Sequence, residues 1–292
     1  MSNEWIKIDD LVIKTNELPA YLDRYNILPT LLRKFIESKY TSPIKPSKEE
    51  QINYYKKFLN DNKINSNEEL LKWLDDRGLD EKRMTMILYD SMKVERFKYE
   101  KFEDKVKPIF LNSKKYFDRV MYSLIRVKSR DEINELYLKL EEDGAIFSEL
   151  ASEYSQGVEK KFNGLLGPME LGKLNPELAE RLRSSKKGQL WPPFQSQGWW
   201  VLLRYEKLIP AQLDNSMKTR IVNELYENWM KENILPLIKT IRKNNNTPIS
   251  SSESDKEFLI DKRDKNESLF SYLKRVSNQY KENLLGKGEN DN

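Results

Sequence analysis

The 292-residue sequence contains no cysteine and no histidine. Without thiols the chain has no disulfide and no cysteine nucleophile, and without imidazoles it lacks the side chain that most often binds transition metals and carries protons near neutral pH. The sequence also has no Asp-x-Asp-x-Asp-Gly loop and no glycine-rich phosphate cradle. We therefore expect neither a metal site nor a nucleotide cofactor.

Long apolar runs are missing as well. No stretch reaches the roughly 18 apolar residues that a membrane-spanning helix needs. The first residues, MSNEWIKIDD, lack the basic start and apolar core of a secretory signal. From the sequence we expect no membrane span and a cytoplasmic protein.

The chain has no strong excess of charge of either sign. It contains 51 basic and 47 acidic residues, which gives a net charge of +4, and the two signs are interspersed. A mixed surface of this kind is typical of a solvated protein and does not favour nucleic-acid binding. The length suits two domains with a tail, which is enough to bury a sizeable core.

Residues 119–209 have the pattern of a small mixed domain. RVMYSLIRV at the start is rich in β-branched and aromatic residues, as a buried strand should be. Ser129-Arg-Asp-Glu132 has the spacing of a helix capping box, and Asn175-Pro176 suits the start of another helix. The expected elements are a strand at 119–127, helices at 133–140 and 146–155, a strand within 164–172, a helix at 175–182 and two strands within 188–209. This β-α-α-β-α-β-β order predicts the α+β fold class with a small sheet.

Three phrases in this segment, AIFSELASEYS, NGLLGPMELGKLNPEL and KKGQLWPPFQSQGWW, resemble the parvulin family of peptidyl-prolyl isomerases in order and spacing. The resemblance implies a site with one histidine on the first strand, a second on the last strand, and an aspartate or cysteine after the Tyr-Ser phrase. It also implies an apolar floor of leucine, methionine and phenylalanine that binds a proline ring.

This chain departs from the family at the polar positions. Leu124 and Trp200 stand where the family has its two histidines. Gly157 stands at the aspartate or cysteine, and Gln195 at a small hydroxyl residue before the last strand. The resemblance therefore carries no catalytic residue over to this chain.

The apolar floor of the family site is kept. Leu166 matches the family leucine, while Leu174 and Leu178 replace the methionine and phenylalanine at the same spacing. The alternative is that these leucines are ordinary core residues. Because neighbours on a strand face opposite sides, one member of the Trp199–Trp200 pair should be buried and the other exposed. The full set of predicted peptide-binding residues is Leu166, Met169, Leu174, Leu178, Phe194 and Trp200.

The absence of histidine does not exclude catalysis of prolyl isomerisation. Twisting a peptide bond meets a barrier of roughly 18–20 kcal/mol because it costs the amide resonance, and a thousandfold acceleration needs a reduction of about 4 kcal/mol. The reaction transfers no proton, so an apolar pocket that desolvates the carbonyl favours the less charge-separated, twisted amide. Weak isomerisation is thus permitted, and peptide binding without isomerisation is the other expectation.

Residues 1–118 have mainly helical patterns. Ser47-Lys-Glu-Glu50 and Ser66-Asn-Glu-Glu69 are further capping-box spacings, each followed by an amphipathic run. The phrase SNEELLKWLDDRGLDEKRM resembles the helical N-terminal module of SurA-type and trigger-factor-like chaperones, and a plain helical bundle is the alternative. The other expected elements are a short strand at 11–14, helices at 17–25 and 28–40, and a long helix from residue 80 to about residue 105.

A last long helix is expected from about residue 216 to residue 242. In SurA-like proteins such a helix returns to the N-terminal helices. The tail begins with the polar stretch NNNTPISSSESDKEF, typical of a disordered linker, and apolar residues from Leu269 to Leu284 then predict a short amphipathic helix. The expected parts are a helical module at 1–118, a parvulin-like domain at 119–209, a C-terminal helix at 210–243 packing on the module, and a low-complexity tail at 244–292.

The sequence is compatible with three functions. The first is a chaperone-like protein that binds unfolded or proline-containing polypeptides, with isomerase activity weak or lost. The second is a genuine isomerase that acts by apolar desolvation. The third is a scaffold or adaptor whose tail contacts a partner. DRVMYSLIRVKS and KLIPAQLD are also similar to a bacterial group of isomerase relatives sometimes linked to type I secretion, which adds a secretion-machinery partner to the expectations.

Overall fold

The computed structural model describes residues 4–8, 11–244 and 275 of the chain. The predicted tail helix lies outside the described residues, apart from Arg275. The elements are β1 Glu4–Ile8, β2 Leu11–Lys14, α1 Leu18–Arg24, α2 Leu28–Thr41, α3 Lys48–Asp61, α4 Asn67–Asp75, α5 Glu81–Phe117, β3 Arg119–Val127, α6 Arg130–Glu141, α7 Phe147–Tyr154, η1 Val158–Phe162, β4 Leu165–Glu170, η2 Leu171–Lys173, α8 Pro176–Ser184, β5 Leu190–Ser196, β6 Trp199–Ile209 and α9 Asn215–Asn244.

The chain divides into two compact units. Among the described residues, one unit comprises 4–8, 11–36, 232–244 and 275, and the other comprises 37–231. Helices α2 and α9 each pass from one unit to the other. In the first unit, the Arg242 guanidinium donates two hydrogen bonds to the Asp23 carboxylate, at 2.7 and 2.9 Å. The domain boundaries expected from the sequence stay predictions.

Helix α3 begins at a complete capping box, as the sequence predicted. The Ser47 hydroxyl accepts from the Glu50 amide at 3.2 Å, and the Glu50 carboxylate accepts from the Ser47 amide at 2.6 Å. At α4 only half of the pattern forms, because Ser66 caps the Glu69 amide while the Glu69 carboxylate accepts from Asn65. These bonds satisfy amides that have no partner inside the helix, and so fix where each helix begins.

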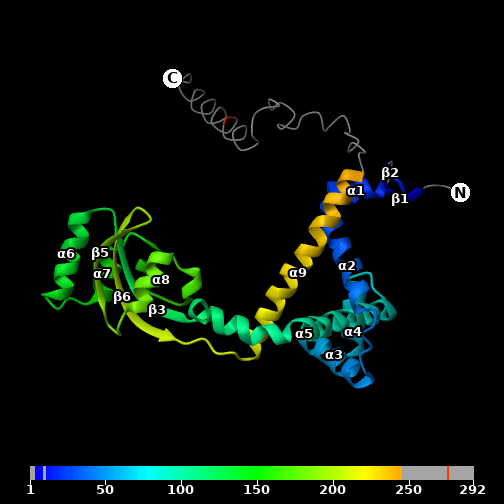
Figure 1. Ribbon diagram of the computed structural model, residues 1–292, viewed down its shortest axis with the longest axis horizontal. Coiled ribbons are helices and arrows are strands. Elements are labelled where there is room, and N and C mark those ends of the chain that lie inside the picture. Colours follow the sequence, from blue (N-terminus) through cyan, green and yellow to red (C-terminus); the bar gives the residue numbers. More distant parts are fainter. Residues whose placement is uncertain (1–3, 9–10, 245–274, 276–292) are drawn as a thin grey trace. The chain divides into compact units, whose positions relative to one another are not determined.

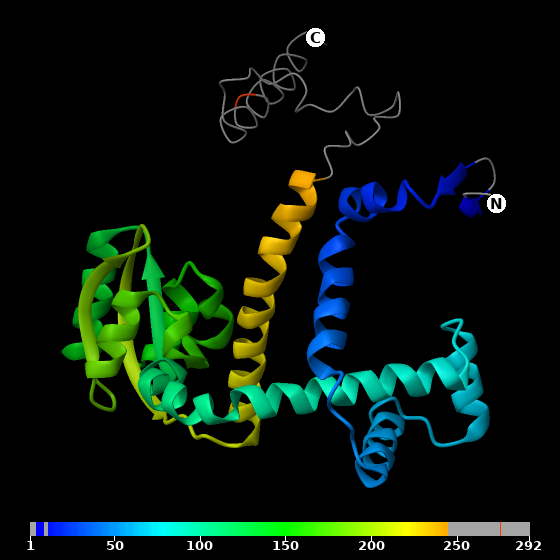
Figure 2. The same ribbon diagram turned by 45° about the vertical axis from the view of Figure 1, so that its right-hand side comes forward.

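Helix α5 is longer than the sequence predicted. We expected it to end near Lys105, but it continues past Pro108 to Phe117. Val106 and Phe110 are buried against Ile221 and Val222 of α9. The free energy gained by this burial offsets the loss of the backbone hydrogen bond that a proline inside a helix removes. The N-terminal half of α5 packs with α3 and α4 around Leu70, Leu74 and Met84 (Figure 2).

The first part of α9 packs on α5 and on the end of α2. The Trp229 ring lies 5.0 Å from the Tyr40 ring and 5.3 Å from the Phe97 ring, measured between centroids. Tyr226 is buried and donates from its hydroxyl to Glu37 at 2.8 Å. The helix that follows the sheet domain therefore returns to helices that precede it within this unit.

Residues 119–209 form a four-stranded antiparallel sheet with strand order β4-β3-β6-β5. The predicted β-α-α-β-α-β-β order and the α+β class are confirmed. Pro192 and Pro193 lie on the edge strand β5, where the register shifts between Trp191 and Phe194. An edge strand tolerates prolines because it needs fewer backbone donors.

Helices cover both faces of this sheet. Figure 1 shows α8 on one side of the strands, with α6 and α7 on the other. Residues 122, 124 and 126 of β3 face α8, and alternate residues such as Ile125 and Val127 face α6 and α7. Each face therefore has its own hydrophobic core.

None of the helices among the described residues is long and apolar enough to cross a membrane. Nor do three or more acidic side chains among them come together as a group able to hold a metal ion.

Candidate functional site

A cavity of about 280 Å³ lies on the α8 face of the sheet. Its walls combine apolar side chains with a few polar ones, and a ligand-sized hollow of this type is the usual form of a binding site. The lining residues come from β3, β4, the start of α8 and the β5–β6 turn region: Tyr122, Leu124, Arg126, Leu166, Lys173, Leu174, Asn175, Leu178, Ser196, Gln197, Trp199 and Val201.

The alternation along β3 builds the centre of the cavity. Tyr122, Leu124 and Arg126 are two residues apart and share one face of the strand. Antiparallel pairing sets Leu124 opposite Leu203, and Arg126 opposite Val201 of β6. Leu124, predicted to occupy the position of the first family histidine, therefore lines the cavity.

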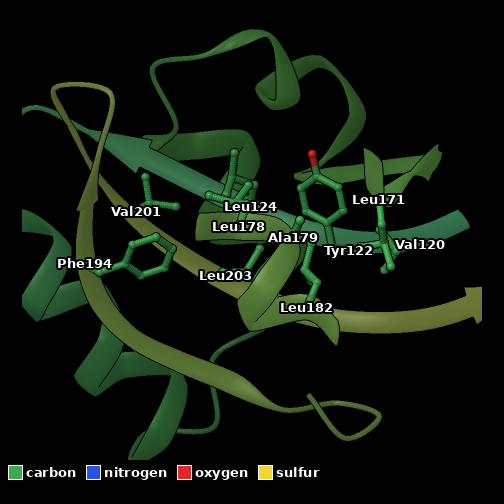
Figure 3. Packing of buried hydrophobic residues seen from close by; sticks show 10 residues of the cluster. All are labelled: Val120, Tyr122, Leu124, Leu171, Leu178, Ala179, Leu182, Phe194, Val201 and Leu203. Carbon is green, nitrogen blue, oxygen red and sulfur yellow. The ribbon is translucent and has the colours of Figure 1, made fainter. Parts of the chain in front are cut away.

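The three leucines of the predicted floor come together in the cavity. Leu166 and Leu174 are half-buried, and Leu178 is 9% exposed. Figure 3 shows Leu178 of α8 against Leu124 and close to Leu203 and Val201. Leu178 therefore belongs to the core as well as to the cavity, whereas Leu166 and Leu174 offer their side chains to a ligand. The peptide-binding role of these leucines stays a prediction.

Two other members of the predicted set do not line the cavity. Phe194 is buried in the same core, where the Arg181 guanidinium covers its ring at 4.0 Å from the centroid. Met169 is 37% exposed on β4, where it pairs with Val120. A direct contact with a peptide in this cavity is thus not supported for either residue.

The prediction for Trp200 needs a correction. Trp200 packs on the α6–α7 core, on the opposite face of the sheet, with the Arg130 guanidinium 5.4 Å from its ring centroid. Trp199 lines the cavity instead, with the Lys128 ammonium 3.5 Å from its ring centroid. Both tryptophans are half-buried, so the expected pair of one buried and one exposed residue is wrong. Helices cover both faces, and each ring therefore has a surface to pack against.

Gln195, like Trp200, lies on the opposite face of the sheet from the cavity. Because Gln195 pairs with Trp200 in the β5–β6 ladder, it shares the far face and is exposed. Its neighbour Ser196 pairs with Trp199 and lines the cavity. The small hydroxyl residue of this site is therefore Ser196, one position later than the family spacing placed it.

A buried ion pair stands where the family aspartate or cysteine was expected. Arg126 donates from Nε and Nη2 to the Glu159 carboxylate at 2.8 and 2.5 Å, and Glu159 is fully buried. The Ser155 hydroxyl donates to the same carboxylate at 2.6 Å and accepts from the Arg126 amide at 3.1 Å. A Cβ at Gly157 would lie only 2.3 Å from Arg126 Nε and 2.4 Å from the Glu159 oxygens. Glycine at 157 thus leaves room for the ion pair.

The ion pair sets the electrostatics beside the cavity. Burial on its own would raise the pKa of Glu159, but the hydrogen bonds from Arg126 and Ser155 outweigh it and hold the pKa below its usual value. The hydrogen bond to Glu159 in turn raises the pKa of Arg126. Both groups are therefore charged at neutral pH.

Tyr122 adds a hydroxyl to the cavity wall. In Figure 3 its ring lies beside Ala179 and its hydroxyl points away from Leu182. Burial raises the pKa of the Tyr122 phenol, with the nearby Arg126 charge lowering it and the Glu159 charge raising it. The phenol is therefore protonated at neutral pH and has a proton to donate.

Sequence reasoning missed Tyr122, Arg126 and Trp199 as cavity residues. Strand alternation through Leu124 would have identified Tyr122 and Arg126, since all three share a face. Glu159 had no such signal, because nothing in its sequence context distinguishes a buried glutamate from the many exposed ones.

The fold is a small sheet domain between helices α5 and α9, with a cavity on the α8 face of the sheet. Residues 110–207 match the family model described as rotamase, the PPIC-type peptidyl-prolyl isomerase domain. The chain thus carries a parvulin-type domain of the peptidyl-prolyl isomerase family, as the sequence resemblance predicted. The search of curated proteins gave no significant match.

Several solved structures are similar to the chain. Peptidylprolyl isomerase (PrsA) from Bacillus anthracis has 22% sequence identity and a TM-score of 0.39, and the match covers 76% of this chain and all of that one. PrsA from Bacillus cereus has 19% identity and a TM-score of 0.41, with 86% and 96% covered. A SurA-like chaperone of Campylobacter jejuni has 16% identity and a TM-score of 0.33, with 84% and 99% covered.

Proposed function

We propose that the chain is a folding factor that binds unfolded or proline-containing polypeptide segments in the cavity of its parvulin-type domain, with isomerase activity weak or lost. The observation that carries the proposal is the apolar floor of Leu166, Leu174 and Leu178, which lines one cavity together with Leu124 and Trp199. Family histidines are missing from this cavity, and its polar wall is built from a different set of groups.

The floor supplies a moderate binding energy. A proline ring offers three methylenes, and at about 0.8 kcal/mol for each buried CH₂ its burial contributes about 2.4 kcal/mol. That contribution favours prolyl segments over polar ones, but it gives only weak affinity by itself. Tight binding therefore needs contacts to the peptide backbone or to a second surface.

A test of this proposal needs a variant that changes the floor without unfolding the domain. Leu178 is unsuitable, because a charge placed there would be buried in the core. Leu174→Ser changes a half-buried wall of the cavity, and Leu138→Ser changes an exposed leucine of α6, on the other side of the sheet. NMR titration with an unstructured Ala-Leu-Pro-Phe peptide should show weaker binding for Leu174→Ser and unchanged binding for Leu138→Ser. Equal affinities in all three proteins would contradict the proposal.

A second candidate is client holding by the helices, which a larger apolar cavity favours. This cavity has a volume of about 450 Å³ and lies between α3 and α5, where Tyr55, Leu59, Leu88 and Met92 are among the side chains that line it. Exposed apolar side chains, Ile52 on α3 and Met86 and Ile87 on α5, lie on the same two helices. Such a surface suits an apolar polypeptide segment without requiring proline.

A further inference from the structure

One nitrogen of the Arg126 guanidinium group, Nη1, is available to a ligand. Nε and Nη2 are held by Glu159, whereas Nη1 has no hydrogen-bond partner among the described residues. The side chain lines the cavity and is 28% exposed, although its anchor Glu159 is fully buried. The charged donor is therefore fixed on one edge and accessible on the other.

The Tyr122 hydroxyl is a second donor of this kind. Tyr122 is 4% exposed and lies on the same face of β3 as Arg126. Within the part of the chain that the structure describes, its hydroxyl has no hydrogen-bond partner. Arg181 Nε is the unpaired polar side-chain atom that is fully buried among the described residues, so the Tyr122 oxygen reaches the cavity and can donate to an acceptor brought by a ligand.

The cavity wall offers the ligand no negative charge. Arg126 and Lys173 are the ionisable cations among its lining residues, and no lining residue is a carboxylate. A prolyl segment suits such a wall, because proline has no amide hydrogen and presents acceptors only. The acceptor nearest to its ring is the carbonyl of the residue before it, which is bonded to the ring nitrogen.

We propose that Arg126 Nη1 and the Tyr122 hydroxyl bind the carbonyl oxygen of the Xaa-Pro bond whose proline ring lies on the leucine floor. This inference rests on the proposed function and assigns the polar half of that site. Glu159 and Ser155 act as positioning residues, because they hold the guanidinium at the wall before the peptide arrives.

Donors on this oxygen have a definite effect on the amide. They stabilise the planar form, in which the oxygen carries negative charge and the C–N bond has partial double-bond character. Rotation needs the opposite, a twisted amide with less charge on oxygen. The two donors therefore strengthen binding and slow rotation of the bound peptide, which fits a protein that holds prolyl segments.

The test compares Arg126→Lys and Tyr122→Phe with two matched controls on the far face. Arg204 is ion-paired to Glu206 and Tyr137 packs on the α6–α7 core, so Arg204→Lys and Tyr137→Phe make the same chemical changes away from the cavity. Tyr122→Phe removes one hydroxyl only, and should leave the thermal unfolding of the domain unchanged. It keeps the proposal testable if Arg126→Lys fails to fold.

The probes are the Ala-Leu-Pro-Phe peptide and its thioxo analogue, with sulfur in place of the Leu-Pro carbonyl oxygen. Sulfur is a poor acceptor, so the wild type should bind the thioxo peptide about tenfold more weakly than the oxo peptide. Tyr122→Phe and Arg126→Lys should weaken oxo-peptide binding by about fivefold or more, and each should shrink the oxo–thioxo difference. The controls should keep the full difference.

Two other outcomes distinguish a failure of the carbonyl assignment from a failure of the proposed function. If Leu174→Ser loses the peptide while Tyr122→Phe and Arg126→Lys keep the wild-type oxo–thioxo difference, the floor binds proline and the carbonyl assignment is wrong. If the wild type binds neither peptide, the proposed function is wrong and the carbonyl assignment falls with it.

Discussion

At the scale of single residues, the ion pair between Arg126 and Glu159 is the feature that sets this domain apart from the site its family resemblance implies. A fully buried carboxylate survives in a protein only when it is paired and hydrogen-bonded, and Glu159 has both Arg126 and Ser155 as donors. Glycine at 157 is the packing condition for this arrangement. The glycine at the position of the family aspartate or cysteine and the ion pair are therefore parts of one packing arrangement.

Restoring a side chain at residue 157 should break this arrangement. Gly157→Ala should lower the free energy of unfolding by about 3 kcal/mol, because the new Cβ would displace a buried ion pair. Gly144→Ala is the control: its φ of +67° makes a side chain strained, but nothing lies within 4 Å, so the cost should be about 1 kcal/mol. Urea unfolding of both variants measures the difference. Equal costs would mean that the ion pair moves aside easily.

The ion pair should also give the domain a dependence on acid pH. The pKa of Glu159 is lowered in the folded state, so its stabilisation is present above the ordinary glutamate pKa of about 4.3 and is lost as pH falls through the folded value. Glu159→Gln should be less stable than the wild type at pH 7 by about 2 kcal/mol. The difference in the free energy of unfolding between the two proteins should narrow below about pH 4. Urea unfolding of both proteins at pH 7 and below pH 4 measures this difference. A gap that stays constant would contradict the charge assigned to Glu159.

The neighbouring tryptophans provide a matched pair of variants for the cavity. Trp199→Ala removes a wall of the cavity and should weaken Xaa-Pro peptide binding about tenfold, which is about 1.4 kcal/mol. Trp200→Ala removes packing on the α6–α7 core and should lower the unfolding temperature while leaving peptide affinity unchanged. Fluorescence titration and thermal unfolding separate the two effects. The reverse pattern would mean that Trp200 faces the ligand.

The sequence predicted the apolar half of the site better than its polar half. Leu166, Leu174 and Leu178 were found because family spacing and local pattern agree along β4 and α8. Trp200 and Gln195 were assigned to the cavity from spacing alone, and pairing in the β5–β6 ladder sets both on the far face. A shift of one residue on a strand reverses the face of a side chain, so spacing without register cannot decide such positions.

At the scale of elements, local rules predicted where helices begin and tertiary packing decided where α5 ends. Ser47, Ser66 and Ser129 each cap the helix that the sequence assigned to them. The end of α5 was misjudged because burial of Val106 and Phe110 against α9 depends on a segment more than a hundred residues away. Strand β1 was also not predicted, and it is paired with β2.

The proline inside α5 gives a prediction at this scale. Pro108 is exposed, and Pro108→Ala should restore a helix hydrogen bond and raise the free energy of unfolding by about 1–3 kcal/mol. Pro176→Ala at the start of α8 is the control, because a proline there removes no hydrogen bond and its replacement should not stabilise the protein. Denaturant unfolding of both variants tests this. A destabilised Pro108→Ala protein would mean that the packing of α5 on α9 requires the proline.

At the scale of the molecule, the cavity of the sheet domain and the cavity between α3 and α5, both in the unit of residues 37–231, differ in character. The cavity of the sheet domain is small and has donors beside an apolar floor, whereas the cavity between α3 and α5 is larger and lined mostly by apolar and aromatic side chains. The first suits a prolyl segment held by ring and carbonyl. The second suits apolar segments of varied sequence, so the client binding that we propose has two separable surfaces.

The measurement that tests the central claim most directly is an NMR search for contacts between a bound Xaa-Pro peptide and assigned leucine methyl groups of the full chain. The account predicts intermolecular contacts from the proline ring protons to the methyl groups of Leu166 and Leu174. Contacts confined to Leu59 and Leu88 would place the peptide between α3 and α5 and contradict the assignment of the sheet-domain cavity as the prolyl-binding site.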